Sequence, residues 1–404
     1  MKTKQLLSIA AAFAVALIIS SCSKKENTSV TTPVIPPSHP IAAGNISGFV
    51  KGTLLTGATY TVTGDVVVKK GDTLAAQPGA IVIVKNNAQF TIEGVLALAG
   101  SQASPVSFNS DKNTPGTWGG FQCDTAQSVT IKWTRIDNTG GLDPSGDPRK
   151  SISVAAPINV DVEDSWLSGG EDDIVGVKAG AKVTILRNTF TSNGSTDGEC
   201  INLKAGVTGV VAYNVIFGQS GTAIKLETSA TAPNPQTSVD VYNNTAVSCG
   251  WRRGAGEPGR GVSVGVNAKA NIYNNIFVNN YEGLEIFPDA DVTNTKYGNN
   301  LFYASVDAFN DNTVTPAVPV NIRANFFPND GVGKATATDL ISTAIGNNDP
   351  KFKTFDGTVV GTATGQGSSN DYHLQSGSPA IGKGNPTYNA DMGAYTTDGK
   401  GNKH

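Results

Sequence analysis

The chain is poor in the residues that most often carry metal and redox chemistry. Its 404 residues include 4 cysteines, 3 histidines and 2 methionines. The histidines are scattered and the cysteines lack zinc-ligand spacing, so we expect neither histidine catalysis nor a zinc site. Three cysteines follow Cys22, an odd number. Cys200 and Cys249 either form a disulfide or remain thiols, with Cys200 filling a strand as a small apolar residue.

Charge of either sign is also scarce. Charged residues make up 16% of the chain, and the formal net charge is −3. Without the two lysines of the leader, 28 basic residues face 33 acidic ones, a balance of about −5. This balance does not favour nucleic-acid binding, so any anionic ligand needs a local basic patch. No apolar run beyond the leader is long enough to span a membrane.

The N-terminus has the features of an export signal. Lys2 and Lys4 precede an apolar run over residues 6–19, and small residues then lead to Cys22. Residues 1–21 are therefore predicted to be a lipoprotein signal peptide, with Cys22 lipidated and residues 22–45 forming a proline-containing tether. The alternative is a plain secretory signal with an incidental cysteine. We expect an exported monomer, held by lipid at the outer membrane or cell surface.

What the chain does have is an internal repeat. Asparagines recur at corresponding places in similar short segments, with spacings of 26, 30, 31 and 25 residues: Asn188, Asn214, Asn244, Asn275 and Asn300. Asp164 and Trp133 are the candidate positions in the two preceding units. Such a period, with short strands and variable insertions, indicates a solenoid. We interpret the asparagines as a stacked ladder of side-chain hydrogen bonds, and the alternative is that they contact a ligand.

Alternating apolar residues mark a short strand in each unit, as at Ile201/Leu203 and Ile224/Leu226. The absence of a long 3.6-residue period disfavours a helical solenoid. The prediction is an all-β, right-handed parallel β-helix with capped ends, covering residues 46–395. Residues 304–395 are expected to supply the last turns and the cap, and residues 396–404 a loose tail.

The chain resembles the right-handed parallel β-helix superfamily that includes pectate-lyase-like proteins. More narrowly, it is similar to β-helix lipoproteins of Bacteroidetes-type bacteria. The resemblance covers roughly residues 50–395, on motifs at residues 71–79, 118–121, 371–381 and 391–395. It implies polysaccharide handling at the cell envelope. In the pectate-lyase-like families a lysine or arginine removes a proton beside a Ca²⁺-bound uronate carboxylate.

Aligning the strand that follows each asparagine places charged residues in columns. The first column reads Asp173, Glu199, Thr222, Arg260 and Glu282. The second reads Gly176, Asn202, Lys225, Ser263 and Glu285, and the third contains Lys178, Lys204 and Glu227. Mixed acids and bases therefore collect on one face, next to a loop that contains Trp251, Arg252 and Arg253. Such a face is either solubilising surface or a carbohydrate site.

For a carbohydrate site, each residue type has a role. The candidate bases of a lyase are Lys225, Arg252, Arg253 and Arg260. Substrate would be bound by Asn202, Lys204 and Glu285, with Trp251 stacking on a sugar ring. Asp173 and Glu199 would hold Ca²⁺, the one cofactor considered. A glycosidase would instead use two facing carboxylates, for which Asp172, Asp173 and Glu199 are available.

The function expected from these patterns is an envelope lipoprotein whose β-helix binds or processes polysaccharide, including Ca²⁺-assisted lyase action on uronate glycans. The alternative is a non-catalytic adhesion or scaffold protein of the cell surface. A complete catalytic set does not emerge from the residues alone.

Overall fold

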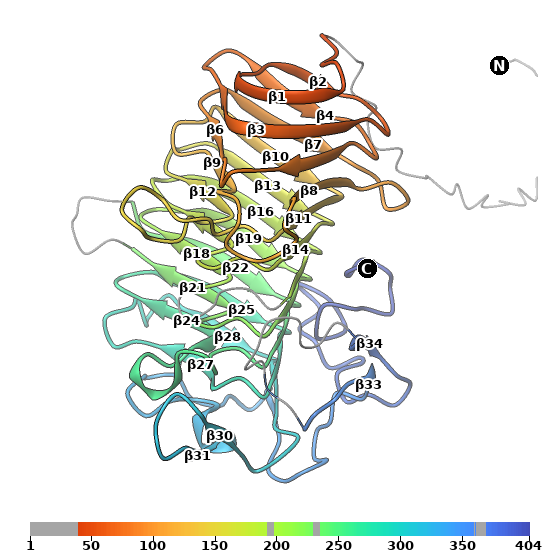
Figure 1. Ribbon diagram of the computed structural model, residues 1–404. Coiled ribbons are helices and arrows are strands. Elements are labelled where there is room, and N and C mark those ends of the chain that lie inside the picture. The colour runs from red at the N-terminus through yellow and green to blue at the C-terminus, as the bar shows by residue number, and fades with distance from the viewer. Residues whose placement is uncertain (1–38, 192–197, 229–234, 359, 361–368) are drawn as a thin grey trace, which may run out of the picture. The chain divides into compact units, whose positions relative to one another are not determined.

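The computed structural model describes residues 39–191, 198–228, 235–358, 360 and 369–404. The signal peptide, Cys22 and most of the predicted tether lie outside these residues. Within them, strands follow one another in a parallel coil (Figure 1). Turns in the middle of the coil contribute three strands each. The turn of β16 (Lys182–Leu186), β17 (Thr189–Thr191) and β18 (Ile201–Lys204) is typical.

The first strand of each turn belongs to a ten-stranded parallel sheet, here called the A face. Neighbouring turns pair residue to residue, as Val183 does with Val160 and Gly209. The strands of the A face besides β16 are β2 (Gly52–Leu54), β4 (Thr73–Ala76), β7 (Val95–Ala99), β10 (Ser128–Lys132), β13 (Asn159–Glu163), β19 (Thr208–Ala212), β22 (Ser238–Tyr242), β25 (Lys269–Tyr273) and β28 (Lys296–Gly298).

The second strand of each turn forms the B1 face. It begins at the N-terminal end with β1 (Gly44–Phe49) and includes β17. Its other strands are β3 (Thr59–Val68), β5 (Ile81–Val84), β8 (Val106–Ser110), β11 (Thr134–Asp137), β14 (Trp166–Ser168), β20 (Val215–Phe217), β23 (Thr245–Val247), β26 (Ile276–Val278), β29 (Leu301–Tyr303) and β32 (Leu340–Ile341).

The third strand of each turn forms the B2 face, which carries the charged columns. The long strand β3 joins B1 to B2, because its first half pairs with β5 and its second half with β6. Besides β18, the B2 face contains β6 (Phe90–Ile92), β9 (Phe121–Gln122), β12 (Ile152–Val154), β15 (Val175–Val177), β21 (Ile224–Glu227), β24 (Arg260–Gly265) and β27 (Glu282–Ile286).

The interior is filled by the alternating apolar residues that the sequence predicted. Ile201, Leu203, Ile224 and Leu226 are each at most 1% exposed. Burying such side chains contributes about 1.5–3 kcal/mol each, so neighbouring turns stabilise one another through this shared core. Cys123, Cys200 and Cys249 are buried free thiols, so the disulfide considered for Cys200 and Cys249 does not form.

The asparagine ladder is confirmed as part of the scaffold. Asn214 donates from both its backbone N–H and its amide to Asn244 Oδ1, over 3.0 and 2.9 Å. Asn244 repeats both contacts with Asn275, over 2.9 and 3.0 Å. All five predicted asparagines are at most 1% exposed, which leaves them inaccessible to a ligand. A buried amide with this many partners fixes the corner between the A and B1 faces.

The two earlier corner positions were placed one residue too early. Ser165, not Asp164, donates its backbone N–H to Asn188 Oδ1, and Thr134, not Trp133, donates to Ser165 Oγ. Trp133 and Asp164 have φ of 48° and 50°. They occupy the left-handed position that precedes each ladder residue, which a short polar side chain such as aspartate tolerates better than tryptophan does.

The C-terminal region differs from the prediction. The hairpin of β30 (Ala308–Asp311) and β31 (Val318–Asn321) and the short helix η2 (Arg323–Asn325) lie near the last turns. The chain then returns along the outside of the B1 face through β33 (Phe352–Thr354) and β34 (Asp371–Leu374). The covering segment forms a second apolar core with B1, which contains Phe217, Ile276, Leu301, Phe352, Tyr372 and Met392. Residues 352–358 and 369–404 are therefore a lateral cover and not further turns.

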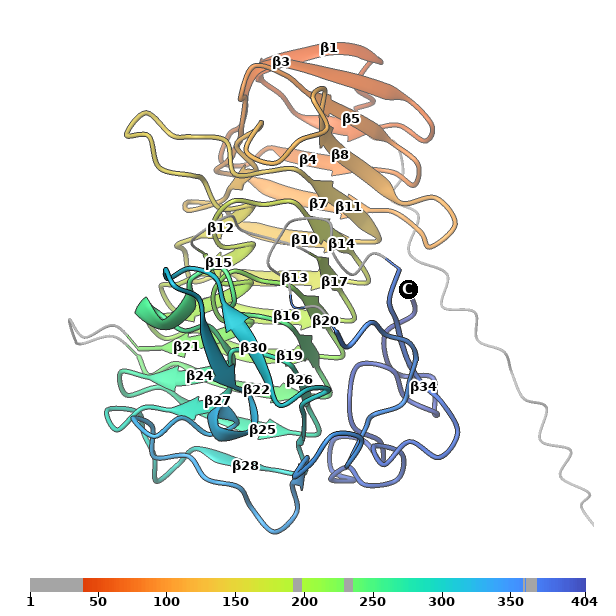
Figure 2. The ribbon, with the colours of Figure 1, turned by 60° about the horizontal axis from the view of Figure 1, so that its bottom comes forward.

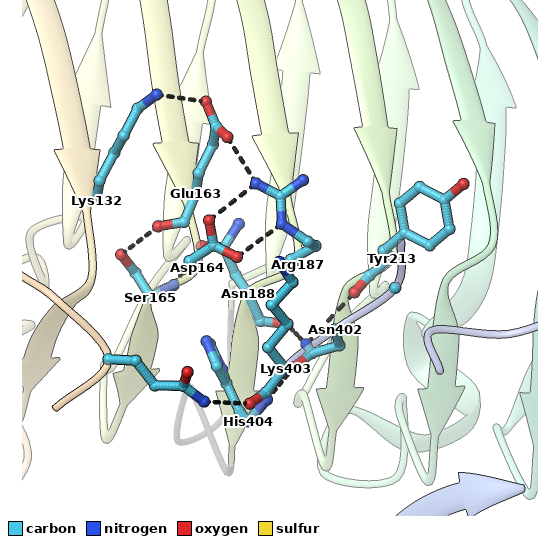
Figure 3. Close-up of polar contacts among 12 residues, drawn as sticks. Lys132, Glu163, Asp164, Ser165, Arg187, Asn188, Tyr213, Asn402, Lys403 and His404 are labelled. Carbon is cyan, nitrogen blue, oxygen red and sulfur yellow. Dashed lines mark hydrogen bonds and ion pairs between the residues drawn. The ribbon is translucent and has the colours of Figure 1, made fainter. Parts of the chain in front are cut away.

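The tail at residues 396–404 is bound and not loose (Figure 3). Asn402 Nδ2 donates to the carbonyl of Asn188 over 3.0 Å, so the tail contacts the corners of the coil. The ring of His404 stacks on Trp166 with centroids 3.9 Å apart. Burial of this ring lowers the pKa of His404 to about 4. Among the described residues, no helix is long and apolar enough to cross a membrane.

Candidate functional site

The charged columns on the B2 face have the predicted register. Asn202 pairs with Lys225, Lys225 with Ser263, and Ser263 with Glu285 across four successive strands. Arg260 likewise pairs with Glu282. Because equivalent positions of parallel strands stack directly, side chains one turn apart in the coil become neighbours and form a continuous column.

The half of this face that belongs to the earlier turns, here called the upper half, contains a chain of ion pairs centred on Glu199. Arg253 Nη1 donates to Glu199 Oε1 over 2.9 Å, and Lys225 Nζ lies 3.7 Å from the same oxygen. Lys225 also lies 3.4 Å from Glu227, which Lys204 approaches to 3.2 Å. The B2 strands thus supply the lysines and Glu227, and the loop at residues 250–259 supplies Arg253.

Asp173 and Glu199 form the adjoining acidic pair. Asn202 Nδ2 donates to Asp173 Oδ2 over 3.0 Å, and Lys150 pairs with the same carboxylate. Burial raises the pKa of Glu199, and the charge of Asp173 raises it further. Burial acts to raise the pKa of Asp173, but the charge of Lys150 and the hydrogen bonds from Lys150 and the Glu199 N–H together lower it.

The lower half of the face is organised by Arg260. Its Nε lies 2.9 Å from Glu282 Oε2 and also donates to Glu285 Oε2. Burial raises the pKa of Glu282 to about 7, and the charges of Glu285 and Asp330 act in the same direction against Arg260. Burial also raises the pKa of Glu285, which is 0% exposed. The Arg260 guanidinium therefore contacts two buried carboxyl groups.

Between the two halves lies a groove with a volume of about 460 Å³. Its floor contains Lys225, Glu227 and Arg260, and Glu257 and Asp330 contribute from segments outside the B2 strands. Phe287 adds an aromatic ring, and the Arg260 guanidinium lies 5.3 Å from that ring's centroid. A smaller hollow of about 50 Å³, lined by Lys178, Asn202 and Lys204, lies on the same face.

One wall of the groove is the loop at residues 250–259, which carries the short helix η1 (Gly254–Gly256). The prediction that Trp251 stacks on a sugar ring is wrong, because this indole is 2% exposed and packs beneath its own loop. Its Nε1 donates to the carbonyl of Asn279 over 2.7 Å, and its ring contacts Tyr281 at 4.9 Å. Phe287 is the aromatic residue that lines the groove.

The predicted site residues do not all converge. The groove brings together Glu199, Lys225 and Arg260, and Arg253 reaches it through Glu199. Arg252 does not line the groove. Burial lowers the pKa of Arg252 to about 10.

Three contributors were missed: Lys150, Glu257 and Asp330. They come from loops outside the repeat, so the alignment of strands gave no signal for them.

The residues predicted to hold Ca²⁺ fit that ion poorly. The carboxylate of Asp173 already meets Lys150 and Asn202, and that of Glu199 meets Arg253 and Lys225. A cation would have to displace these donors and lie beside their charges. The described part of the chain contains no group of three or more acidic, histidine or cysteine side chains arranged to hold a metal ion.

Comparison with known families agrees with this architecture. Residues 119–302 match a family model described as the right-handed beta helix region. The chain is a right-handed parallel β-helix. The matched segment includes the strands of the groove from β18 to β27. Searches of curated proteins and of solved structures gave no match.

Proposed function

We propose that this β-helix is a lipid-anchored protein of the cell envelope whose B2 groove binds polysaccharide. The observation that carries the proposal is the groove itself, which combines Lys225, Glu227 and Arg260 with the ring of Phe287. Carboxylate and guanidinium groups form directional hydrogen bonds with hydroxyl groups, and an aromatic face packs against the C–H groups of a sugar ring. A chain of sugars can extend along the stacked turns.

The ion pairs favour ligands rich in hydroxyl groups over strongly anionic ones. Lys225 lies between two glutamates, and Arg260 serves Glu282 and Glu285. A uronate carboxylate would compete with these glutamates for each cation, whereas a hydroxyl group adds hydrogen bonds without breaking a pair. We therefore place binding ahead of lyase cleavage. The alternative considered from the sequence is a non-catalytic adhesion or scaffold protein, whose sheet face would bind glycan or another envelope protein without cleavage.

The test is retention of the mature chain, carrying Cys22→Ser to keep it soluble, in gels that contain one polysaccharide each. The panel includes neutral glycans and uronate glycans, the latter with and without Ca²⁺. We expect retention by at least one neutral glycan and about tenfold weaker binding for Lys225→Ala. Lys269→Ala is the matched control, since Lys269 belongs to strand β25 of the A face. No retention by any glycan contradicts the proposal.

The same samples distinguish binding from cleavage. A lyase produces an unsaturated sugar that absorbs in the ultraviolet, whereas a binder leaves the absorbance constant. We expect constant absorbance. Steady formation of the unsaturated product, abolished by Arg253→Ala or Arg260→Ala, would replace the binding function by lyase action at the same groove.

A further inference from the structure

A buried aspartate outside the repeat connects the groove wall to the last turns. Asp311 ends strand β30 of the hairpin and is 0% exposed. Its Oδ2 accepts the backbone N–H of Ala255 over 2.9 Å and the hydroxyl of Tyr281 over 3.1 Å. Its Oδ1 accepts the N–H and the hydroxyl of Thr313 over 2.8 and 2.6 Å.

Four hydrogen bonds to one carboxylate make a strong connection. Hydrogen bonds to a charged acceptor are about twice as strong as neutral ones, and an acceptor without water depends entirely on these donors. The donated bonds lower the pKa of Asp311 despite its burial. The carboxylate therefore stays ionised and bonded at neutral pH.

The contact with Ala255 is the one that concerns the groove. Ala255 lies in η1, within the loop that lines the groove. Figure 2 shows the backbone of this loop beside the hairpin of β30 and β31. Gly254 has φ of 61°, and a Cβ there would lie 1.9 Å from Thr313 Oγ1 and 2.8 Å from the Asp311 carboxylate. The loop and the hairpin are therefore in direct contact, with room only for glycine at this point.

Aromatic packing reinforces the same connection. Phe309 of β30 packs edge-on against Trp251 with centroids 5.6 Å apart, and Tyr281 lies under the same indole. Two residues beyond Trp251, Arg253 reaches Glu199 in the groove. A continuous set of contacts thus leads from the hairpin through the loop to the centre of the groove.

We propose that Asp311 is a positioning residue that holds the loop at residues 250–259 as a wall of the glycan groove. It touches no ligand itself and acts through the backbone of Ala255. This inference rests on the proposed function for its effect on glycan binding, but the position of the loop can be tested without any glycan. The hairpin is thereby part of the site, although it lies some 50 residues later in the chain.

The first experiment follows the loop alone, in the mature chain with Cys22→Ser. Limited trypsin digestion reports cleavage after Arg252 or Arg253, and acrylamide quenching reports exposure of Trp251. For Asp311→Ala we expect cleavage at the loop to be about tenfold faster or more, because local opening limits proteolysis. We also expect increased quenching, which disappears when Trp251→Phe is combined with Asp311→Ala. Tyr281→Phe, which retains the Ala255 contact, should have a smaller effect.

Controls separate positioning from general destabilisation. Asp307→Ala removes an exposed carboxylate near the same hairpin, which pairs with Arg323, and should leave loop cleavage unchanged. The thermal midpoint of the β-helix should change little in either variant. Unchanged cleavage and quenching in Asp311→Ala would overturn the proposal. So would accelerated cleavage at many sites with a lowered midpoint, since that shows a purely structural role.

The second experiment uses the polysaccharide retained by the parent protein. We expect Asp311→Ala to bind about tenfold more weakly, and Asp311→Asn, which keeps an acceptor for Ala255, to recover part of the affinity. If the parent protein retains no glycan, the proposed function fails and the digestion result decides the loop's position alone. If the parent binds and Asp311→Ala binds equally, the positioning role is refuted while the groove proposal stands.

Discussion

Removing one asparagine from the ladder should destabilise the whole coil. Asn244→Ala deletes the acceptor of the Asn214 N–H, and that N–H is then buried without a partner. It also deletes the bond from the Asn214 amide to Asn244 Oδ1 and the bond from the Asn244 amide to Val211. An orphaned buried group costs about 1–3 kcal/mol and each further lost bond about 1 kcal/mol. The expected loss is about 3–5 kcal/mol.

The assay is urea unfolding followed by circular dichroism, on the mature chain with Cys22→Ser. Asn271→Ala is the control, because Asn271 belongs to the next turn and makes one partly buried bond to Asp240. It should cost about 1 kcal/mol or less. Asn244→Asp is a second variant of nearly the same volume. It keeps an acceptor for Asn214 but cannot donate to Val211 and Asn275, so it should also destabilise strongly.

The volume-matched variant separates hydrogen bonding from cavity formation. If Asn244→Asp were as stable as the parent protein, the ladder's donated bonds would contribute nothing. A loss below about 1 kcal/mol for Asn244→Ala, equal to that of Asn271→Ala, would refute the ladder as a source of stability.

Three further predictions concern the side chains of Glu282, His404 and Cys22. Burial raises the pKa of Glu282 to about 7. The folded protein then holds a proton that the unfolded chain has lost, so stability should fall by about 2 kcal/mol between pH 4.5 and 7.5, and Glu282→Gln should flatten that part of the profile. For His404 the pKa is lowered to about 4. The unfolded or released tail binds the proton first, so docking should weaken by about 1–3 kcal/mol as pH falls from 6.5 to 4, measured by hydrogen exchange at Asn402 and abolished in His404→Ala. Finally, Cys22→Ser should remove labelling by radioactive palmitate and release the protein from membranes.

Each of these has a contradicting result. A stability profile unaffected by Glu282→Gln shows that Arg260 keeps the Glu282 carboxylate ionised throughout. Tail exchange that is constant between pH 4 and 6.5 contradicts the burial effect on His404. Membrane association that persists in Cys22→Ser, with no palmitate on the parent protein, supports the plain secretory signal instead.

The repeat predicted the B2 columns correctly because each unit of the repeat can be recognised from its own short stretch of sequence. In a parallel coil, residues at the same place in successive repeats must stack, so aligning the strands amounts to aligning the turns. Asn202, Lys225 and Glu285 were placed in one column on this basis, and the register confirms it. The spacing of the asparagines likewise predicted the ladder.

The walls of the groove could not be predicted in the same way. Trp251 was predicted to stack on a sugar ring, but its indole is buried and packs against Phe309 of the hairpin at residues 308–321. Asp330 and Lys150 reach the B2 face from segments without a repeat, so their positions depend on tertiary contacts alone. The apolar outer side of B1 resembles a core surface, but no pattern in the sequence predicts that residues 352–358 and 369–404 cover it.

Polysaccharide binding is proposed for the groove over strands β21 and β24. Its most direct test is a crystal structure of the mature chain with an oligosaccharide prepared from the retained glycan. We expect sugar density in the groove, with hydroxyl groups bonded to Lys225 and Glu227 and a ring packed against Phe287. Density confined to the A face or to the tail at His404, with the groove empty, would contradict it.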